Sequence, residues 1–194
     1  MFSIIRVNMN LFDKDNRFNI ANLVTYLNVA LGVSAIYFIV KDDFFTAIVL
    51  AWIAGACDIL DGKLARKYKL STEFGIQLDS FADFLSFVVM PSFLLFYALK
   101  SGMHSGWEEL FIGLVFIIYI ILGLRRLIEF NLKADVGEIE KFFEGVPTPF
   151  GAILLWILYL LYSYAVVSNI FVITFLVAVV AWSLNSKLRI IPHP

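Results

Sequence analysis

The stretch at residues 58–83 reads DILDGKLARKYKLSTEFGIQLDSFAD, and it joins two hydrophobic segments through a short basic turn. It carries four acids, Asp58, Asp61, Asp79 and Asp83, inside or at the edges of those segments. A carboxylate at membrane depth costs roughly 2.5–3.5 kcal/mol on insertion scales, so such residues are rare in spans and mark functional sites. A compensating ligand is therefore expected where these acids meet.

Composition indicates a membrane protein. The 194 residues are 61% hydrophobic, with a mean hydropathy of +0.86, whereas soluble domains are closer to half apolar. One cysteine, Cys57, excludes an intrachain disulfide. Residues 1–19 lack the apolar core and cleavage site of a signal peptide. We expect them to form a short amphipathic helix at the membrane surface, with a solvated arm as the alternative. Its apolar side chains are Phe2, Ile4, Ile5, Met9, Leu11 and Phe12.

Six hydrophobic stretches predict transmembrane helices, each of which needs about 17–25 residues. They are Ile20–Val40, Phe44–Leu64, Phe74–Leu99, Trp107–Leu127, Thr148–Val166 and Ile170–Ser186. The connections are short, and no Pro- or Ser-rich linker or internal repeat interrupts them. The sequence therefore predicts an all-α integral membrane protein, with residues 20–190 forming one six-transmembrane-helix bundle.

Lysine and arginine predict the orientation of this bundle, because cytoplasmic loops carry an excess of both. Only Lys41 and Lys100 fall on one side of the predicted spans. The other thirteen are Arg6, Lys14, Arg17, Lys63, Arg66, Lys67, Lys69, Arg125, Arg126, Lys133, Lys141, Lys187 and Arg189. Both termini and the acid-rich segment are therefore expected to be cytoplasmic, in a cell-membrane protein with several spans.

The spacing of the acids predicts two pairs that face each other. Asp58 and Asp61 are three residues apart, and Asp79 and Asp83 are four apart, so each pair shares a helix face. A tight turn at Lys69–Thr72 makes the two helices antiparallel neighbours. Mg²⁺ and Mn²⁺ prefer carboxylate oxygens, and two such ions can clamp both sides of a phosphoryl displacement. The alternative is a set of acids that line a water-filled cavity or ion path.

These residues carry a family resemblance. The pattern Asp58-x2-Asp61-Gly62-x2-Ala65-Arg66-x8-Gly75-x3-Asp79-x3-Asp83 resembles the signature of the CDP-alcohol phosphotransferases. The resemblance implies a membrane enzyme, usually a homodimer, that transfers a phosphatidyl-type group from a CDP-linked lipid to an alcohol and releases CMP. It also implies two divalent cations, Mg²⁺ or Mn²⁺.

The resemblance assigns roles to individual positions. It implies that Asp58, Asp61 and Asp79 bind metal beside the diphosphate, and that Asp83 contacts the second ion and acts as general base. The segment NLVT at residues 22–25 is similar to the family's PNLxT, with Ala21 in place of the usual proline. The residues implied to bind the CDP-lipid are Asn22, Thr25, Asp58, Gly62, Ala65, Arg66 and Thr72.

Three further segments resemble the phosphatidylserine synthase branch. LDSFADFLSFVVMP (residues 78–91) is similar to its LDSxxDxxSFGxxP, with Val88 in place of the glycine. FFEGVPTPFGA (residues 142–152) resembles its FxGLPxPxA. RLIEFN (residues 126–131) is similar to its RLARFN, with Glu129 at the second arginine. The implied reaction joins CDP-diacylglycerol, or an archaeal CDP-lipid, to L-serine.

The residues agree with an amino-acid acceptor, since serine brings a carboxylate and an ammonium group to its pocket. Both signs of charge occur near the cytoplasmic ends of the fourth and fifth spans, on Arg125, Arg126, Glu129 and Glu144. The alternatives are ordinary positive-inside residues there, or another acceptor such as glycerol 3-phosphate, inositol phosphate or choline. The only histidines, His104 and His193, cannot supply a paired His-Lys-Asp mechanism, so direct transfer is expected. No feature indicates nucleic-acid binding.

Overall fold

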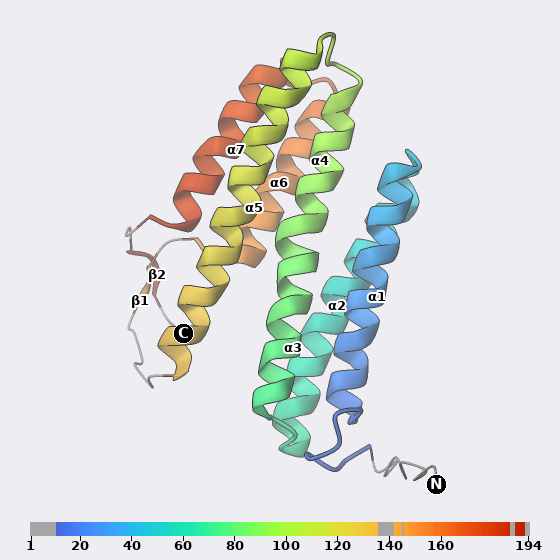
Figure 1. The fold of residues 1–194 in the computed structure, drawn as a ribbon, viewed down its shortest axis with the longest axis vertical. Coiled ribbons are helices and arrows are strands. Elements are labelled where there is room, and N and C mark those ends of the chain that lie inside the picture. Colours follow the sequence, from blue (N-terminus) through green and yellow to red (C-terminus); the bar gives the residue numbers. More distant parts are fainter. Residues whose placement is uncertain (1–10, 136–141, 145, 187–188, 193–194) are drawn as a thin grey trace, which may run out of the picture.

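The computed structural model describes residues 11–135, 142–144, 146–186 and 189–192, and the side chains of residues 11–132 and 146–186. Its elements are α1 (Ile20–Val40), α2 (Phe44–Tyr68), α3 (Glu73–Asp83), the π-helix η1 (Phe84–Val89), α4 (Met90–Lys100), α5 (Gly106–Asp135), β1 (Phe142–Glu144), α6 (Thr148–Ser163), α7 (Ile170–Leu184) and β2 (Arg189–Pro192). The described part is an antiparallel helical bundle with one small two-stranded sheet (Figure 1).

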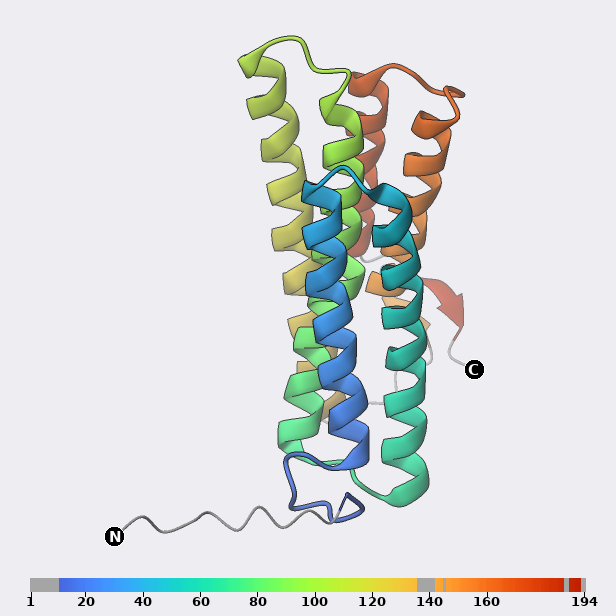
Figure 2. The same ribbon diagram turned by 90° about the vertical axis from the view of Figure 1, so that its right-hand side faces the viewer.

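The rod formed by α3, η1 and α4 is the centre of the bundle. α1 packs against α2 and against both helical halves of the rod. α5 and α6 pack against its α4 half, and α7 packs against α5 and α6. In Figures 1 and 2 the rod accordingly runs from the α1–α2 pair at one end to the α5–α7 group at the other. The four aspartates therefore sit in the half built by α1, α2 and α3.

The predicted apolar helices are all present. Four of them are long and apolar enough to cross a membrane: Ile20–Val40, Phe44–Tyr68, Glu73–Lys100 and Gly106–Leu132. The last two, α6 and α7, have 16 and 15 residues. At about 1.5 Å per residue they reach less than the ~30 Å of a typical hydrocarbon core. The all-helical class is confirmed, and the count of six complete spans stays a prediction.

Several helix ends differ from their predicted positions. α2 continues four residues past Leu64 to Tyr68, and α5 continues eight past Leu127 to Asp135. α6 ends at Ser163 and α7 at Leu184, both shortly before their predicted ends. The extension of α5 places Glu129 on the same helix as Arg125 and Arg126. Hydropathy marks where a helix leaves the apolar layer, but backbone hydrogen bonding continues into polar sequence until a cap ends it. Lys69, with a left-handed backbone at φ 55°, is the cap that ends α2.

The predicted N-terminal helix is only partly open to comparison, because residues 1–10 lie outside the described residues. Leu11–Asn19 form turns, so the prediction of a helix is wrong for this part. Asn19 is the N-cap of α1, and its side chain accepts a hydrogen bond from the Asn22 backbone amide. The Phe12 ring contacts the Tyr68 ring in a tilted arrangement, at a centroid distance of 4.9 Å, and connects this segment to the end of α2.

Small residues set the close contacts between helices. A Cβ on Gly123 of α5 would lie 2.5 Å from Val88 Cγ1, and one on Gly32 of α1 would lie 3.0 Å from Leu85 Cδ2. Both neighbours belong to η1, so α1 and α5 hold this turn from two sides. Such close backbone approach is typical of helix packing in membranes, where small residues substitute for a hydrophobic driving force.

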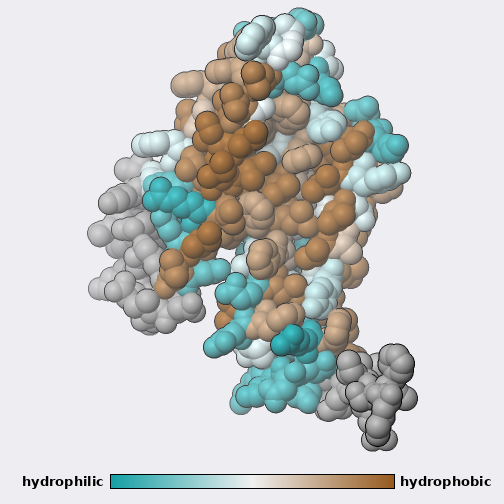
Figure 3. All heavy atoms as spheres, viewed as in Figure 1, coloured by the Kyte–Doolittle hydropathy of each residue, from teal (hydrophilic) through white to brown (hydrophobic). Residues whose placement is uncertain are grey.

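The outer surface is apolar in its middle and more polar toward its ends (Figure 3). Large exposed side chains there include Trp52, Leu114, Ile118 and Phe175. Figure 3 shows hydrophobic side chains over the central part of one face and hydrophilic ones gathered at the end where α2 meets α3. This distribution fits a protein whose sides contact lipid and whose α2–α3 end faces water.

Candidate active site

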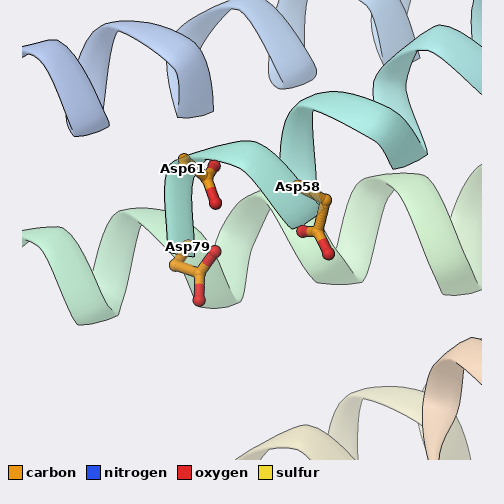
Figure 4. Close-up of side chains that lie close together, drawn as sticks. All are labelled: Asp58, Asp61 and Asp79. Atoms are coloured by element: carbon orange, nitrogen blue, oxygen red, sulfur yellow. The ribbon is translucent and has the colours of Figure 1, made fainter. Parts of the chain in front are cut away.

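Three of the aspartates converge between α2 and α3. One carboxylate oxygen from each of Asp58, Asp61 and Asp79 lies within 4.8 Å of the others. Asp58 and Asp61 project from one face of α2 toward Asp79 on α3 (Figure 4). The spacing of three residues puts both α2 acids on that face, and the turn after Tyr68 brings α3 alongside. The predicted facing of acids across these two helices is confirmed.

Asp83 extends the cluster by one helical turn. It is the last residue of α3, half-buried, and its carboxyl group lies close to that of Asp58. All four aspartates of residues 58–83 therefore form one group. Asp83 occupies its deeper end and Asp79, which is exposed, its outer end.

The residues fit a hard divalent cation. Asp61 is 3% exposed, and its Oδ2 atom has no hydrogen-bond partner among the described residues. A buried carboxylate oxygen without a donor carries a desolvation penalty that a bound cation removes. Three carboxylates with no histidine or thiolate among them are the donor set of Mg²⁺ or Mn²⁺. Asp58, Asp61 and Asp79 are thus able to hold such an ion.

A cavity of about 230 Å³ opens beside the acids. It lies between α1, α2 and α3, where the starts of α1 and α3 meet the end of α2. It is lined by Ala21, Asn22, Thr25, Asp61, Gly62, Ala65, Arg66, Leu70, Ser71, Thr72, Gly75, Ile76 and Asp79. The structure therefore gathers Asn22, Thr25, Gly62, Ala65, Arg66 and Thr72, six positions predicted to bind the CDP-lipid, in one place.

Gly75 keeps the mouth of this cavity open. A Cβ there would lie 3.1 Å from Asn22 Oδ1 and 3.3 Å from Thr72 Oγ1, which is tighter than most contacts. Thr72 caps α3, because its hydroxyl oxygen accepts a hydrogen bond from the Gly75 amide at 3.0 Å. Asn22 is fixed by donating from Nδ2 to the Arg17 carbonyl oxygen at 3.1 Å. Local hydrogen bonds therefore fix the polar side chains at the mouth of the cavity.

Arg66 brings positive charge to the cavity. Its guanidinium nitrogen lies 3.5 Å from the position of a Cβ on Gly62, so a larger residue at 62 would crowd it. Arg66 is exposed and forms no ion pair with the described residues. An unpaired guanidinium beside carboxylates that hold a cation suits a diphosphate, which needs bidentate donors as well as metal.

The residues predicted for the acceptor have different environments. Arg125 is exposed and forms an ion pair with Glu129, with Nη2 and Oε1 2.8 Å apart. Arg126 is only 7% exposed, and its Nε donates to the Val146 carbonyl oxygen at 3.4 Å. Glu144 ends β1, and the prediction for its side chain lies outside the described side chains. Among Arg125, Arg126 and Glu129, whose side chains the structure describes, Arg126 is the one that the fold buries.

Two polar residues next to the acids were missed from the sequence. Asn28 of α1 donates from Nδ2 to Asp58 Oδ1 at 3.4 Å, and Ser86 of η1 donates to Asn28 Oδ1 at 2.7 Å. Ser86 lies seven residues after Asp79, which is the spacing of a shared helix face. Asn28 has no such signal, because its neighbour Asp58 is thirty positions away in sequence.

Comparison with known proteins agrees with this geometry. The family model described as CDP-alcohol phosphatidyltransferase matches residues 18–184. Three relatives named CDP-diacylglycerol–serine O-phosphatidyltransferase are similar to this chain. The Methanocaldococcus jannaschii protein is 35% identical over 70% of this chain and 58% of its own length. The Bacillus subtilis protein is 30% identical over 73% of this chain and 75% of its own length. The Mycobacterium tuberculosis protein is 31% identical over 67% of this chain and 45% of its own length.

The match with the mycobacterial relatives is partial, since the chain spans about half of their length. The family match is broader, because it begins before α1 and ends with α7. It therefore contains all four aspartates and every residue that lines the cavity. This chain belongs to the CDP-alcohol phosphatidyltransferase family.

Proposed function

We propose that this protein transfers a phosphatidyl group from CDP-diacylglycerol, or an archaeal CDP-lipid, to the hydroxyl of L-serine. The observation that carries the proposal is the convergence of Asp58, Asp61 and Asp79 beside a cavity that Arg66 also lines. Relatives named for this reaction support it. A metal-binding acid cluster next to a basic cavity suits a nucleotide diphosphate better than an ion path, which needs polar groups across the whole membrane depth.

The donor lies with its cytidine and diphosphate in the cavity. Asp58, Asp61 and Asp79, with Asp83 at the inner end, would hold two Mg²⁺ or Mn²⁺ ions. When bound, these ions neutralise charge on the diphosphate and on the displaced phosphate. Arg66 donates to phosphate oxygens, and Gly62 and Gly75 leave room for the nucleotide. Asn22, Thr25, Ala65 and Thr72 line the remaining wall.

The transfer is a direct displacement. The serine hydroxyl oxygen attacks the phosphorus that carries the lipid, and a new P–O bond forms to serine. The bond from that phosphorus to the bridging oxygen breaks, and CMP leaves with the electron pair. Asp83 takes the hydroxyl proton. A neutral serine hydroxyl is a weak nucleophile until a base removes its proton. The products are phosphatidylserine and CMP.

Serine is the acceptor that the surrounding charges favour. The buried Arg126 holds its carboxylate, and the Arg125–Glu129 pair and Glu144 supply the charges at the edge of its pocket. A phosphorylated alcohol would need several unpaired cations, whereas Arg125 is already paired with Glu129. The site faces the cytoplasm, in a cell-membrane protein with both termini inside that forms a homodimer.

The proposal is tested by measuring CMP release from CDP-diacylglycerol by the purified protein in detergent. L-serine, glycerol 3-phosphate, inositol phosphate and choline are compared, with and without Mg²⁺ or Mn²⁺. We expect CMP release and phosphatidylserine only when serine and a divalent ion are both present. Release with another alcohol in place of serine would keep the family chemistry and reject the acceptor.

A further inference from the structure

Asn28 is a fully buried amide in the middle of an apolar helix. It is 0% exposed, and both ends of its side chain are bonded to other helices. Its Nδ2 reaches Asp58 of α2 at 3.4 Å, and its Oδ1 reaches Ser86 of η1 at 2.7 Å. A buried polar group in a span is costly unless it is satisfied. These two bonds satisfy it and join three helices to the acid cluster.

The directions of these bonds follow from the groups involved. An ionised carboxylate only accepts hydrogen bonds, so the amide must turn Nδ2 toward Asp58. Its carbonyl oxygen then faces Ser86, and an amide oxygen only accepts, so the serine hydroxyl must donate. The chain therefore runs one way, from Ser86 to Asn28 to Asp58. Ser86 fixes the amide, and the amide fixes one oxygen of Asp58.

The fold brings Ser86 into reach. Gly32, one turn along α1 from Asn28, would place a Cβ 3.4 Å from Ser86 Oγ and 3.0 Å from Leu85, so only glycine lets η1 come this close without displacement. On the far side Val88 presses against Gly123 of α5. π-turns inside long helices are uncommon and are frequently found at functional sites. Here the π-turn starts directly after Asp83 and carries the serine.

We propose that Asn28 and Ser86 are positioning residues that hold the Asp58 carboxylate in its metal-binding orientation. The inference rests on the proposed role of the acid cluster as a cation site. Asp58 shares its surroundings with Asp61, Asp79 and Asp83, and repulsion between carboxylates turns an unrestrained side chain away. The amide donor offsets this repulsion on one oxygen and leaves the other for the ion. Hydrogen-bond partners of metal ligands typically contribute 10–100-fold in metal affinity.

Simple helix attachment is the competing role. An interhelical amide–hydroxyl bond between α1 and η1 would explain Asn28 and Ser86 without any metal. That role changes stability but has no direct effect on the affinity for a cation. Metal affinity and thermal stability of the same variants therefore separate the two explanations.

The experiment is a Mn²⁺ titration followed by electron paramagnetic resonance, on metal-stripped protein in detergent. The variants are Asn28→Leu, Ser86→Ala and the double variant, with Ser92→Ala as matched control. Ser92 is also buried and lies on the same rod, but its hydroxyl donates to the backbone carbonyl oxygen of Val88, one turn earlier, and not to another helix's side chain. Asp61→Ala, which removes a ligand, is the reference for lost binding.

We expect Asn28→Leu to weaken Mn²⁺ binding about tenfold or more and Ser86→Ala to weaken it by a smaller factor. The double variant should be no weaker than Asn28→Leu, because Ser86 acts through Asn28. Ser92→Ala should bind within twofold of the parent. At saturating Mn²⁺ the kcat of Ser86→Ala for CMP release should return to within a few-fold of the parent value.

The outcomes are distinct. If the parent binds no Mn²⁺ in the cluster, the proposed function loses its metal site. If the parent binds and Asn28→Leu binds equally well, the positioning role alone is wrong. If Asn28→Leu does not fold, the comparison of Ser86→Ala with Ser92→Ala still tests the proposal. Equal Mn²⁺ affinities of these two variants would reject the positioning role.

Discussion

Asp83 differs from the other aspartates in where it stands. Asp58 and Asp61 lie on α2 and Asp79 faces them from the middle of α3, whereas Asp83 ends α3 at the start of the π-turn. Its carboxyl group lies close to that of Asp58, at the end of the cluster away from exposed Asp79. An acid in this position suits the proposed role of a base that meets the attacking hydroxyl.

The first prediction concerns this base. Asp83→Asn keeps the shape of the side chain and one oxygen but cannot take up a proton. We expect donor binding to stay near normal while kcat for CMP release falls by about 10²–10⁴-fold, the usual range for loss of a general base. Donor titration and a CMP assay with serine check it. Turnover within a few-fold of the parent would assign the proton to water or another group.

The second prediction concerns Arg126, whose guanidinium is buried and bonded to the Val146 carbonyl oxygen. If it also holds the serine carboxylate, Arg126→Ala should raise the serine KM far more than the CDP-lipid KM. Arg125→Ala is the comparison, because that arginine is exposed and paired with Glu129 and should change the serine KM less. An equal rise for both substrates in Arg126→Ala would give the residue a structural role only.

At the scale of elements, the continuous rod of α3, η1 and α4 positions the site. η1 contacts α1, α2, α5 and α6, so it links the half that holds the acids to the half that holds Arg126. The contact with α5 depends on Gly123, where the protein leaves no room for a methyl group. Tight interiors resist added volume, because neighbouring side chains must leave their preferred rotamers.

The third prediction follows from that contact. Gly123→Ala should lower stability by about 1–3 kcal/mol through overpacking against Val88. Gly113→Ala on the same helix is the matched control: its Cβ would lie 3.8 Å from Phe96, and alanine favours a helix. Thermal unfolding in detergent should show a loss for the first and none for the second. Val88→Ala should restore much of the loss in Gly123→Ala, and no recovery would contradict the proposed clash.

At the scale of the whole molecule, charge and apolar surface agree on an orientation. The last turn of α2 carries Lys67 and the following turn carries Lys69, at the same end as the cavity. The turn before α5 lies at the other end of the rod (Figure 2). Positive charge is retained on the cytoplasmic side of membranes. We therefore expect the cavity to face the cytoplasm.

The fourth prediction tests this orientation by cysteine labelling. The native Cys57 is buried, so background reaction with a membrane-impermeant maleimide should be low. His104→Cys, in the exposed turn before α5, should label in intact spheroplasts. Lys67→Cys, exposed near the end of α2, should label only after the membrane is opened. The reverse labelling pattern would show the opposite membrane orientation, with the cavity on the outer side.

The sequence by itself determined the helical class, the starts of the apolar helices and the facing of the four acids. Hydropathy and spacing are local, and a turn of a few residues leaves two helices no arrangement other than antiparallel contact. This is why Asp58, Asp61, Asp79 and Asp83 could be placed together from residues 58–83 alone.

Only the tertiary structure decided which residues surround the four aspartates. The Asn28 contact with Asp58 joins residues thirty positions apart, and Ser86 reaches Asn28 across fifty-eight. The π-turn that carries Ser86 packs between Gly32 of α1 and Gly123 of α5, a contact between distant parts of the chain that no local propensity encodes. Burial of Arg126 beside exposed Arg125 likewise depends on where α6 and its preceding loop pack. Residues that are neighbours on one helix have similar surroundings in the sequence. Their burial and contacts differ because these depend on residues from distant parts of the chain.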